Sequence, residues 1–340
     1  MNAKKAIIGA AALLLVLAGQ NARAQAPAPT HVTIAQTSIA IGFAATSIAA
    51  DEGFFQKNGL DVDVQLVGHG DPDTLAALHS GDANFGAMTL VPAMQAMARG
   101  ENLQIVTPFV REFVIMFVMN PDVAKKIGLT PGMPLKEKFA RAKGLTVGTL
   151  DVGGGLHIMF RSLAKQFGFD PEHDYNVTAI NSYPTLLAAA QRGEIDIALT
   201  AIPYGRQGVQ QDGLVMMTDF WGGDVPEYRG AVHQGLVVEA DYAAKNPDVV
   251  ARMHRAMEET LVFMHTNPDK TVADLHNRYP NLSEDLLRSF IVGDAKSYAG
   301  HAVVERKGFQ IIRDFVAANS NPDAAGLKYE TVVIPAAQEK

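Results

Sequence analysis

The sequence predicts an α/β protein of two lobes, each with a mainly parallel sheet flanked by helices. Short β-branched runs alternate with helix-like segments along the first part of the chain, and this alternation is typical of parallel sheets. The same alternation restarts after a Pro/Gly-rich break at Leu129–Pro134. With 340 residues, of which 48% are hydrophobic, the chain is long enough to form two modest cores.

The first lobe is expected to contain four strands with helices between them. The strands are His31–Ala35, Asp61–Val67, Ala83–Gly86 and Gln104–Phe109, and the helices lie near 43–57, 71–80 and 89–99. Asp71 is predicted to cap a helix that starts at Pro72, and Gly81 to end it in a left-handed conformation. Since ligands of parallel sheets lie beyond the carboxyl ends of the strands, these tight joints predict a ligand edge.

The second lobe is expected to contain a glycine turn that could bind an anion. Its strands are Leu145–Leu150, Asn176–Ile180, Asp196–Thr200 and Leu214–Met217. Gly153-Gly154-Gly155 leaves the first of them and enters a helix, where backbone N–H groups and the helix N-terminus favour an anion. The turn matches neither the Walker motif nor the dinucleotide fingerprint. Both an anion cradle and a plain flexible turn remain possible interpretations.

The first 24 residues are predicted to be a signal peptide. Lys4 and Lys5 precede the apolar run Ala6–Ala18, and Ala22-Arg23-Ala24 supplies the small residues of a cleavage site after Ala24. The apolar run is too short to span a bilayer, which takes about 20 residues. The chain has no cysteine, so no thiol can carry a lipid anchor. We therefore expect a protein that diffuses freely in the periplasm.

Charge and motifs argue against several function classes. The net charge of −7 comes with no basic block, so a nucleic-acid partner is not expected. The sequence contains no GxSxG and no HExxH, and its ten histidines show no metal-ligand spacing. We therefore predict no enzyme activity, no metal and no cofactor.

Four segments carry a resemblance to a known family. Gln36-Thr37-Ser38, "GFFQKNGLDV", "ALHSGDANFG" and "AAAQRGEIDIAL" together resemble the substrate-binding proteins of nitrate/sulfonate/taurine-type ABC importers, the NMT1/THI5-like proteins. The pattern covers about residues 30–270. The resemblance implies a type II periplasmic binding fold, in which two crossing strands join the lobes and the ligand cleft lies between them. It also implies a small-molecule ligand and, as partners, a permease in the inner membrane and its ATPase.

The resemblance also implies how the chain is divided. Lobe 1 would contain residues 27–115 and 231–340, lobe 2 would contain residues 116–230, and Glu112–Met119 and His233–Glu239 would cross between them. The later helices would return to lobe 1, with an apolar stripe in its core that includes Val250, Met253, Met257 and Leu261. We expect a monomer that closes on its ligand.

Candidate ligand contacts follow from the matching motifs. The resemblance implies Thr37, Ser38, Gly70, Met88 and Thr89 in lobe 1, and Gly155, His157, Thr200 and Ala201 in lobe 2; the glycine turn adds Gly154. His157 could instead cap a neighbouring carbonyl, and His69 could be a solvated loop residue. The aromatic residue that members often have after "IDIAL" is missing, which argues against taurine or a simple alkanesulfonate.

Other residues are candidates by their chemistry alone. Arg111, Arg206 and Arg229 could each clamp a carboxylate or sulfonate through paired hydrogen bonds, and Tyr204 and Trp221 could stack on a flat ligand. The predicted ligand is therefore a small organic anion, a sulfonate or a carboxylate, whose body could be aromatic. A neutral pyrimidine-type heterocycle and a periplasmic sensor role stay open. A thiamin-pyrimidine-synthase-like enzyme would rely on a cysteine-rich iron site, and the chain has no cysteine.

Overall fold

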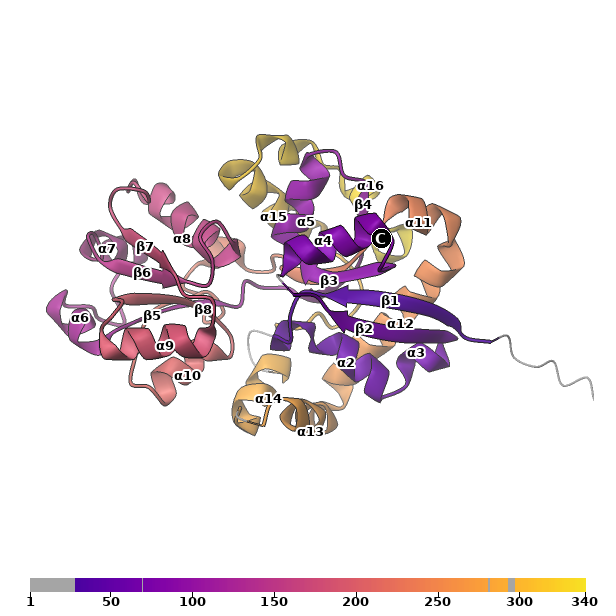
Figure 1. Cartoon of the computed structure of the whole chain (residues 1–340), viewed down its shortest axis with the longest axis horizontal. Coiled ribbons are helices and arrows are strands. Elements are labelled where there is room, and N and C mark those ends of the chain that lie inside the picture. Colours follow the sequence, from indigo (N-terminus) through magenta and orange to yellow (C-terminus); the bar gives the residue numbers. More distant parts are fainter. Residues whose placement is uncertain (1–27, 69, 281, 293–296) are drawn as a thin grey trace, which may run out of the picture.

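The computed structural model describes residues 28–68, 70–280, 282–292 and 297–340, which form two lobes side by side (Figure 1). The predicted signal peptide and His69 lie outside the described residues. Each lobe contains one five-stranded sheet with helices packed against it. Within the described ranges, no helix is both long and apolar enough to cross a bilayer.

The sheet of lobe 1 has the order β2-β1-β3-β10-β4. Its strands are β1 (Thr30–Gln36), β2 (Leu60–Leu66), β3 (Phe85–Thr89), β4 (Leu103–Val110) and β10 (Gln234–Glu239). Strand β1 runs parallel to β2 and β3, whereas β10 is antiparallel to both of its neighbours, β3 and β4. The sheet is therefore mixed, because β10 comes back from the other lobe and enters in the opposite direction.

Helices from both ends of the described chain cover this sheet. They are α2 (Ala44–Asp51), α3 (Phe54–Lys57), α4 (Asp71–Ser80), α5 (Leu90–Ala98), α11 (Ala240–Lys245), α12 (Pro247–Thr266), α13 (Pro268–Arg278), α14 (Glu284–Val292), α15 (Arg306–Asn319) and α16 (Tyr329–Val332). The apolar stripe of α12 is buried, with Met253, Met257 and Leu261 fully inaccessible. The predicted core role of this stripe is confirmed.

The sheet of lobe 2 repeats this architecture in the order β7-β6-β8-β5-β9. Its strands are β5 (Ile115–Met119), β6 (Thr146–Thr149), β7 (Asn176–Ala179), β8 (Ile197–Ala201) and β9 (Val215–Asp219), and its helices are α6 (Pro121–Lys126), α7 (Leu135–Arg141), α8 (Gly155–Gln166), α9 (Tyr183–Arg192) and α10 (Tyr204–Gln210). Strand β5 is antiparallel to β8 and β9. In the core, Phe160 packs against Phe117 and Phe139 at ring-centroid distances of 5.8 and 5.2 Å.

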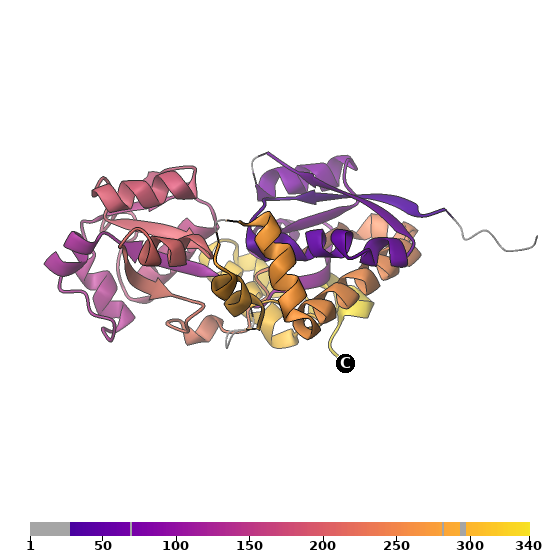
Figure 2. The ribbon, with the colours of Figure 1, turned by 90° about the horizontal axis from the view of Figure 1, so that it is seen from below.

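The chain passes between the sheets just before β5 and just before β10. The expected crossings Glu112–Met119 and His233–Glu239 thus each consist mostly of a strand that lies within one sheet. The two passages touch: the Phe113 ring lies 5.5 Å from that of Tyr228 and 4.8 Å from that of His233, between centroids. From below, α14 lies in the region between the lobes (Figure 2).

Candidate ligand-binding site

At the strand ends of lobe 1, Asp71 brings two predicted site residues together. Its Oδ1 accepts hydrogen bonds from the Thr37 hydroxyl at 2.7 Å and from the Thr89 backbone N–H at 3.1 Å. Its Oδ2 accepts a hydrogen bond from the Thr89 hydroxyl. Both threonine hydroxyls therefore donate hydrogen bonds to Asp71, and the lone pairs of the hydroxyl oxygens can act only as acceptors.

The predicted helix-capping role of Asp71 is wrong. Helix α4 starts at Asp71 with Gly70 as its N-cap, and no side chain caps it. The donors on Thr37, just after β1, and on Thr89, at the end of β3, hold the carboxyl group away from the N–H groups of its own helix. Burial raises the pKa of Asp71, while the hydrogen bonds from Thr89 and Thr37 oppose that rise. The predicted left-handed end at Gly81 is confirmed, with φ of 79°.

Several other predicted contact residues serve local structure. The Thr200 side chain is fully buried and donates its hydroxyl to the Met116 carbonyl at 2.8 Å. Met88 is fully buried in the core of lobe 1. The Ser38 hydroxyl accepts a hydrogen bond from the Ala40 N–H at 3.2 Å. Ala201, at the end of β8, is partly exposed.

In lobe 2, His157 holds the glycine turn. The Gly153 N–H donates to His157 Nδ1 at 2.9 Å, so the neutral ring carries its proton on Nε2. The side chain is buried, and burial lowers the pKa of His157, with the Arg161 charge adding to the effect. His157 Nδ1 thus accepts a hydrogen bond from a backbone N–H of the turn and does not cap a carbonyl with that atom.

The three glycines of the turn differ in their requirements. Gly153 has a φ of 93°, which side chains rarely adopt. A Cβ on Gly154 would collide with the Asp151 carboxylate, whereas a Cβ on Gly155 would meet no atom within 4 Å. Only Gly153 therefore requires glycine for its backbone conformation; a side chain at position 154 would require the exposed Asp151 carboxylate to move, and Gly155 has room for a side chain.

Negative charge from both lobes meets at the strand ends. Asp151 follows β6 in lobe 2, and its charge contributes to the raised pKa of Asp71 in lobe 1. Beside them, the rings of Tyr183 and Tyr204 stack at 4.3 Å between centroids. Tyr204, a candidate for stacking on a ligand, thus has one face covered by Tyr183.

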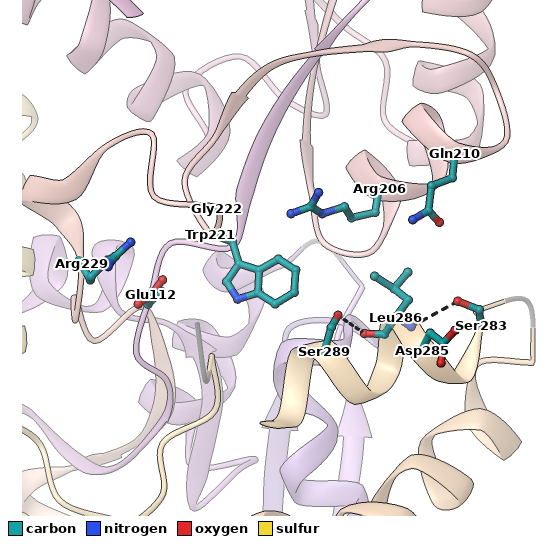
Figure 3. Close-up of a pocket in the computed structure, with 10 residues that line it drawn as sticks. All are labelled: Glu112, Arg206, Gln210, Trp221, Gly222, Arg229, Ser283, Asp285, Leu286 and Ser289. Atoms are coloured by element: carbon teal, nitrogen blue, oxygen red, sulfur yellow. Dashed lines mark hydrogen bonds between the residues drawn. The ribbon is translucent and has the colours of Figure 1, made fainter. Parts of the chain in front are cut away.

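A cavity of about 910 Å³ lies between the lobes, and both contribute to its wall (Figure 3). Its lining residues are Glu112, Arg206, Gln210, Trp221, Gly222, Arg229, Ser283, Asp285, Leu286 and Ser289. This volume is within the range of small-molecule sites. Arg206, Arg229 and Trp221, which were candidates by their chemistry, are brought together here. The contacts inferred from the family resemblance are not part of this lining, and neither is Arg111, which pairs with Glu305.

Of the two arginines in the cavity, one is paired with a carboxylate and the other is not. Arg206 donates from Nη2 to Asp219 Oδ2 at 2.6 Å, and its guanidinium lies 5.3 Å from the Trp221 ring centroid. The Arg229 guanidinium has no hydrogen bond or ion pair with any described residue, and it packs over Gly223. Arg229 therefore has its full set of donors available to a ligand.

Sequence reasoning missed Glu112 and the residues of α14. Glu112 was assigned to a crossing strand, and no local pattern marks its carboxylate as special. Ser283, Asp285 and Ser289 reach the cavity because α14 packs against the gap between the lobes, as Figure 3 shows. Among the described residues, no group of three or more His, Cys, Asp or Glu could hold a metal ion.

Comparison with known families identifies the chain's relatives. Residues 41–271, more than half of the chain, match the profile of NMT1/THI5-like proteins. The chain belongs to the NMT1/THI5-like family. The resemblance carried by the four sequence segments is thus confirmed. A comparison with curated proteins found no match.

Solved structures show the same fold as this NMT1/THI5-like chain. The aliphatic sulphonate binding protein SsuA from Escherichia coli has a TM-score of 0.68 and 17% identity, covering 89% of this chain and 99% of its own. SsuA from Xanthomonas axonopodis pv. citri, bound to MOPS, gives 0.63 and 14%, covering 92% and 98%. The nitrate-binding protein NrtA from Synechocystis PCC 6803 gives 0.64 and 16%, covering 87% and 84%. The predicted two-lobed periplasmic binding fold is confirmed.

Proposed function

We propose that this protein is the substrate-binding component of an ABC importer, which captures a small organic anion in the periplasm and delivers it to a permease in the inner membrane. The ligand would be a sulfonate or carboxylate with a flat or apolar body. The observation that supports this best is the cavity between the lobes, where the available Arg229 guanidinium lies in one wall with Arg206 and Trp221. Structures with the same fold include sulfonate- and nitrate-binding proteins.

The chemistry of the cavity favours an organic ligand over a bare inorganic anion. A guanidinium with five donors suits the planar or trigonal oxygens of a carboxylate or sulfonate. The indole of Trp221 and the side chain of Leu286 supply apolar surface beside those donors. A cavity of about 910 Å³ is also much larger than nitrate requires.

The location and partners belong to the same proposal. The signal-peptide pattern of residues 1–24 supports export, and the absence of cysteine supports a protein without a lipid anchor. A monomer would present both lobes to the permease, and the ATPase would act on the permease from the cytoplasmic side. A sensor that docks on a receptor would use the same cavity; loss of ligand uptake in cells that lack the protein would distinguish transport from sensing.

The proposed ligand class is tested by calorimetry on the purified protein with aromatic sulfonates, aromatic carboxylates and neutral pyrimidines. We expect an organic anion to bind, and Arg229→Met to weaken its binding on the order of tenfold or more, equivalent to about 1.4 kcal/mol. Arg192→Met is the matched control, because Arg192 pairs with Glu194 on the exposed surface of the same lobe. Tight binding of a pyrimidine alone, unaffected by Arg229→Met, would contradict the proposal.

A further inference from the structure

Glu112 presents to the cavity a carboxylate without a protein partner in the described part of the chain. Its side chain lines the cavity, and the residue is only 9% exposed. It forms no hydrogen bond with any described residue, and no described cation lies within ion-pair distance of it. A carboxylate that lines a cavity and has no protein donor can accept a hydrogen bond from a ligand.

The environment of Glu112 does not supply that donor. Arg111, its neighbour in sequence, is engaged with Glu305. Arg229 influences the carboxylate only through its charge: burial raises the pKa of Glu112, and the charges of Arg229 and Arg111 oppose this. In Figure 3, Glu112 and Arg229 lie together at one end of the cavity, and Trp221 lies between them and α14.

Trp221, in the same cavity lining, has a donor without an acceptor. Its indole Nε1 is buried and has no hydrogen-bond partner among the described residues, and the residue is 8% exposed. An indole N–H can only donate, so it needs an acceptor atom. Glu112 therefore faces the cavity without a protein donor, whereas the Trp221 N–H beside it is enclosed and has no protein acceptor among the described residues.

The cavity wall carries charged side chains of both signs. Arg206 and Arg229 contribute positive charge, and Glu112 and Asp285 contribute carboxyl groups. A ligand with only an anionic group would be attracted by the arginines and would leave Glu112 buried beside a like charge. A ligand that also carries an N–H donor would supply Glu112 with a hydrogen bond while its anionic group binds Arg229.

We propose that Glu112 is a specificity-determining residue that accepts a hydrogen bond from an amine or other N–H group of the ligand, while Arg229 binds the anionic group of the same molecule. The inference rests on the proposed function and narrows it: the ligand is an organic anion that also carries an N–H donor. Replacing the N–H group by an apolar group of equal size should leave Glu112 without its donor and cost affinity.

The test compares matched probes on the purified protein by calorimetry. One pair is para-(aminomethyl)benzoate and para-ethylbenzoate, and the other is para-(aminomethyl)benzenesulfonate and para-ethylbenzenesulfonate. We expect at least one amine-bearing member to bind on the order of tenfold more tightly than its ethyl analogue. In Glu112→Gln, that preference should fall to less than about threefold through weaker binding of the amine.

Glu284→Gln is the control, because Glu284 is an exposed carboxylate in the first turn of α14 and is not part of the lining. It should keep the preference for the amine. Melting of unliganded Glu112→Gln establishes that the variant is folded. If Glu112→Gln weakened binding of the amine probe and of its ethyl analogue by the same factor, the role of Glu112 would be overturned. The same holds if Glu112→Gln and Glu284→Gln had equal effects on the affinities. Either result would leave the proposed function standing. Failure of all four probes to bind would overturn the proposed ligand class together with this inference.

Discussion

At the scale of single residues, unsatisfied or shifted polar groups gather where the lobes meet. Asp71 organises the strand ends of lobe 1, Glu112 lines the cavity, and His233 lies in the passage that leads into β10. His233 Nδ1 is buried and unpartnered among the described residues, and its ring lies against Phe113. Burial lowers the pKa of His233 to about 4. This shift makes the passage between the lobes sensitive to acid.

The stability of the protein should therefore fall as the pH falls from about 6.5 to about 4. Above this window His233 is neutral in both states; within it the unfolded chain binds a proton and the folded protein does not, so unfolding becomes easier by at most about 1.4 kcal/mol per pH unit. His233→Phe removes the titrating group, and its melting temperature should fall less between pH 7 and pH 5. His157, whose pKa is also lowered, contributes equally to both proteins. An equally steep fall in the variant would show that His233 is not responsible.

At the scale of elements, the sequence predicts most strands because they are short runs of β-branched and other apolar residues between turn residues. The antiparallel placement of β5 and β10 could not be predicted, since strand direction depends on partners that are far away in the chain. Arg206, Arg229 and Trp221 could be proposed from residue type alone. The contribution of α14 could not, because the position of a C-terminal helix between the lobes is decided by tertiary packing. The turn that leads into α8 shows the same limit, because the sequence alone does not tell which of its three consecutive glycines has a positive φ.

Gly153→Ala and Gly155→Ala should separate those roles. Alanine at position 153 must adopt a φ of 93°, which costs about 1–3 kcal/mol, so the melting temperature should fall by several degrees. Alanine at position 155 enters the first turn of α8 with no atom within 4 Å of its Cβ, and it should leave the melting temperature unchanged or raise it slightly. Thermal melting of the two unliganded variants measures this difference. A larger loss at position 155 would mean that the turn has another conformation in solution.

At the scale of the whole molecule, the gap between the lobes is bordered by exposed apolar side chains. Among the described residues, the large hydrophobic side chains that stand exposed are Ile39 (63%), Leu66 (57%) and Val152 (62%). Ile39 follows β1 and Leu66 ends β2 in lobe 1, and Val152 follows β6 in lobe 2. All three therefore lie at carboxyl ends of parallel strands, at the edges where the two sheets face one another (Figure 1). Closure of the lobes would remove this surface from water.

We therefore expect a ligand to draw the lobes together and Val152 to contribute to the closed state. Small-angle scattering should show a smaller radius of gyration at saturating ligand, because a ligand that contacts both lobes favours the arrangement in which it makes both sets of contacts. Val152→Ser should weaken ligand binding about fivefold, since partial burial of one such side chain contributes about 1 kcal/mol. It should leave the unliganded melting temperature nearly unchanged, because the side chain is exposed before closure. An unchanged radius with confirmed, saturating ligand would refute closure, and a lowered unliganded melting temperature would show instead that Val152 supports the fold of lobe 2.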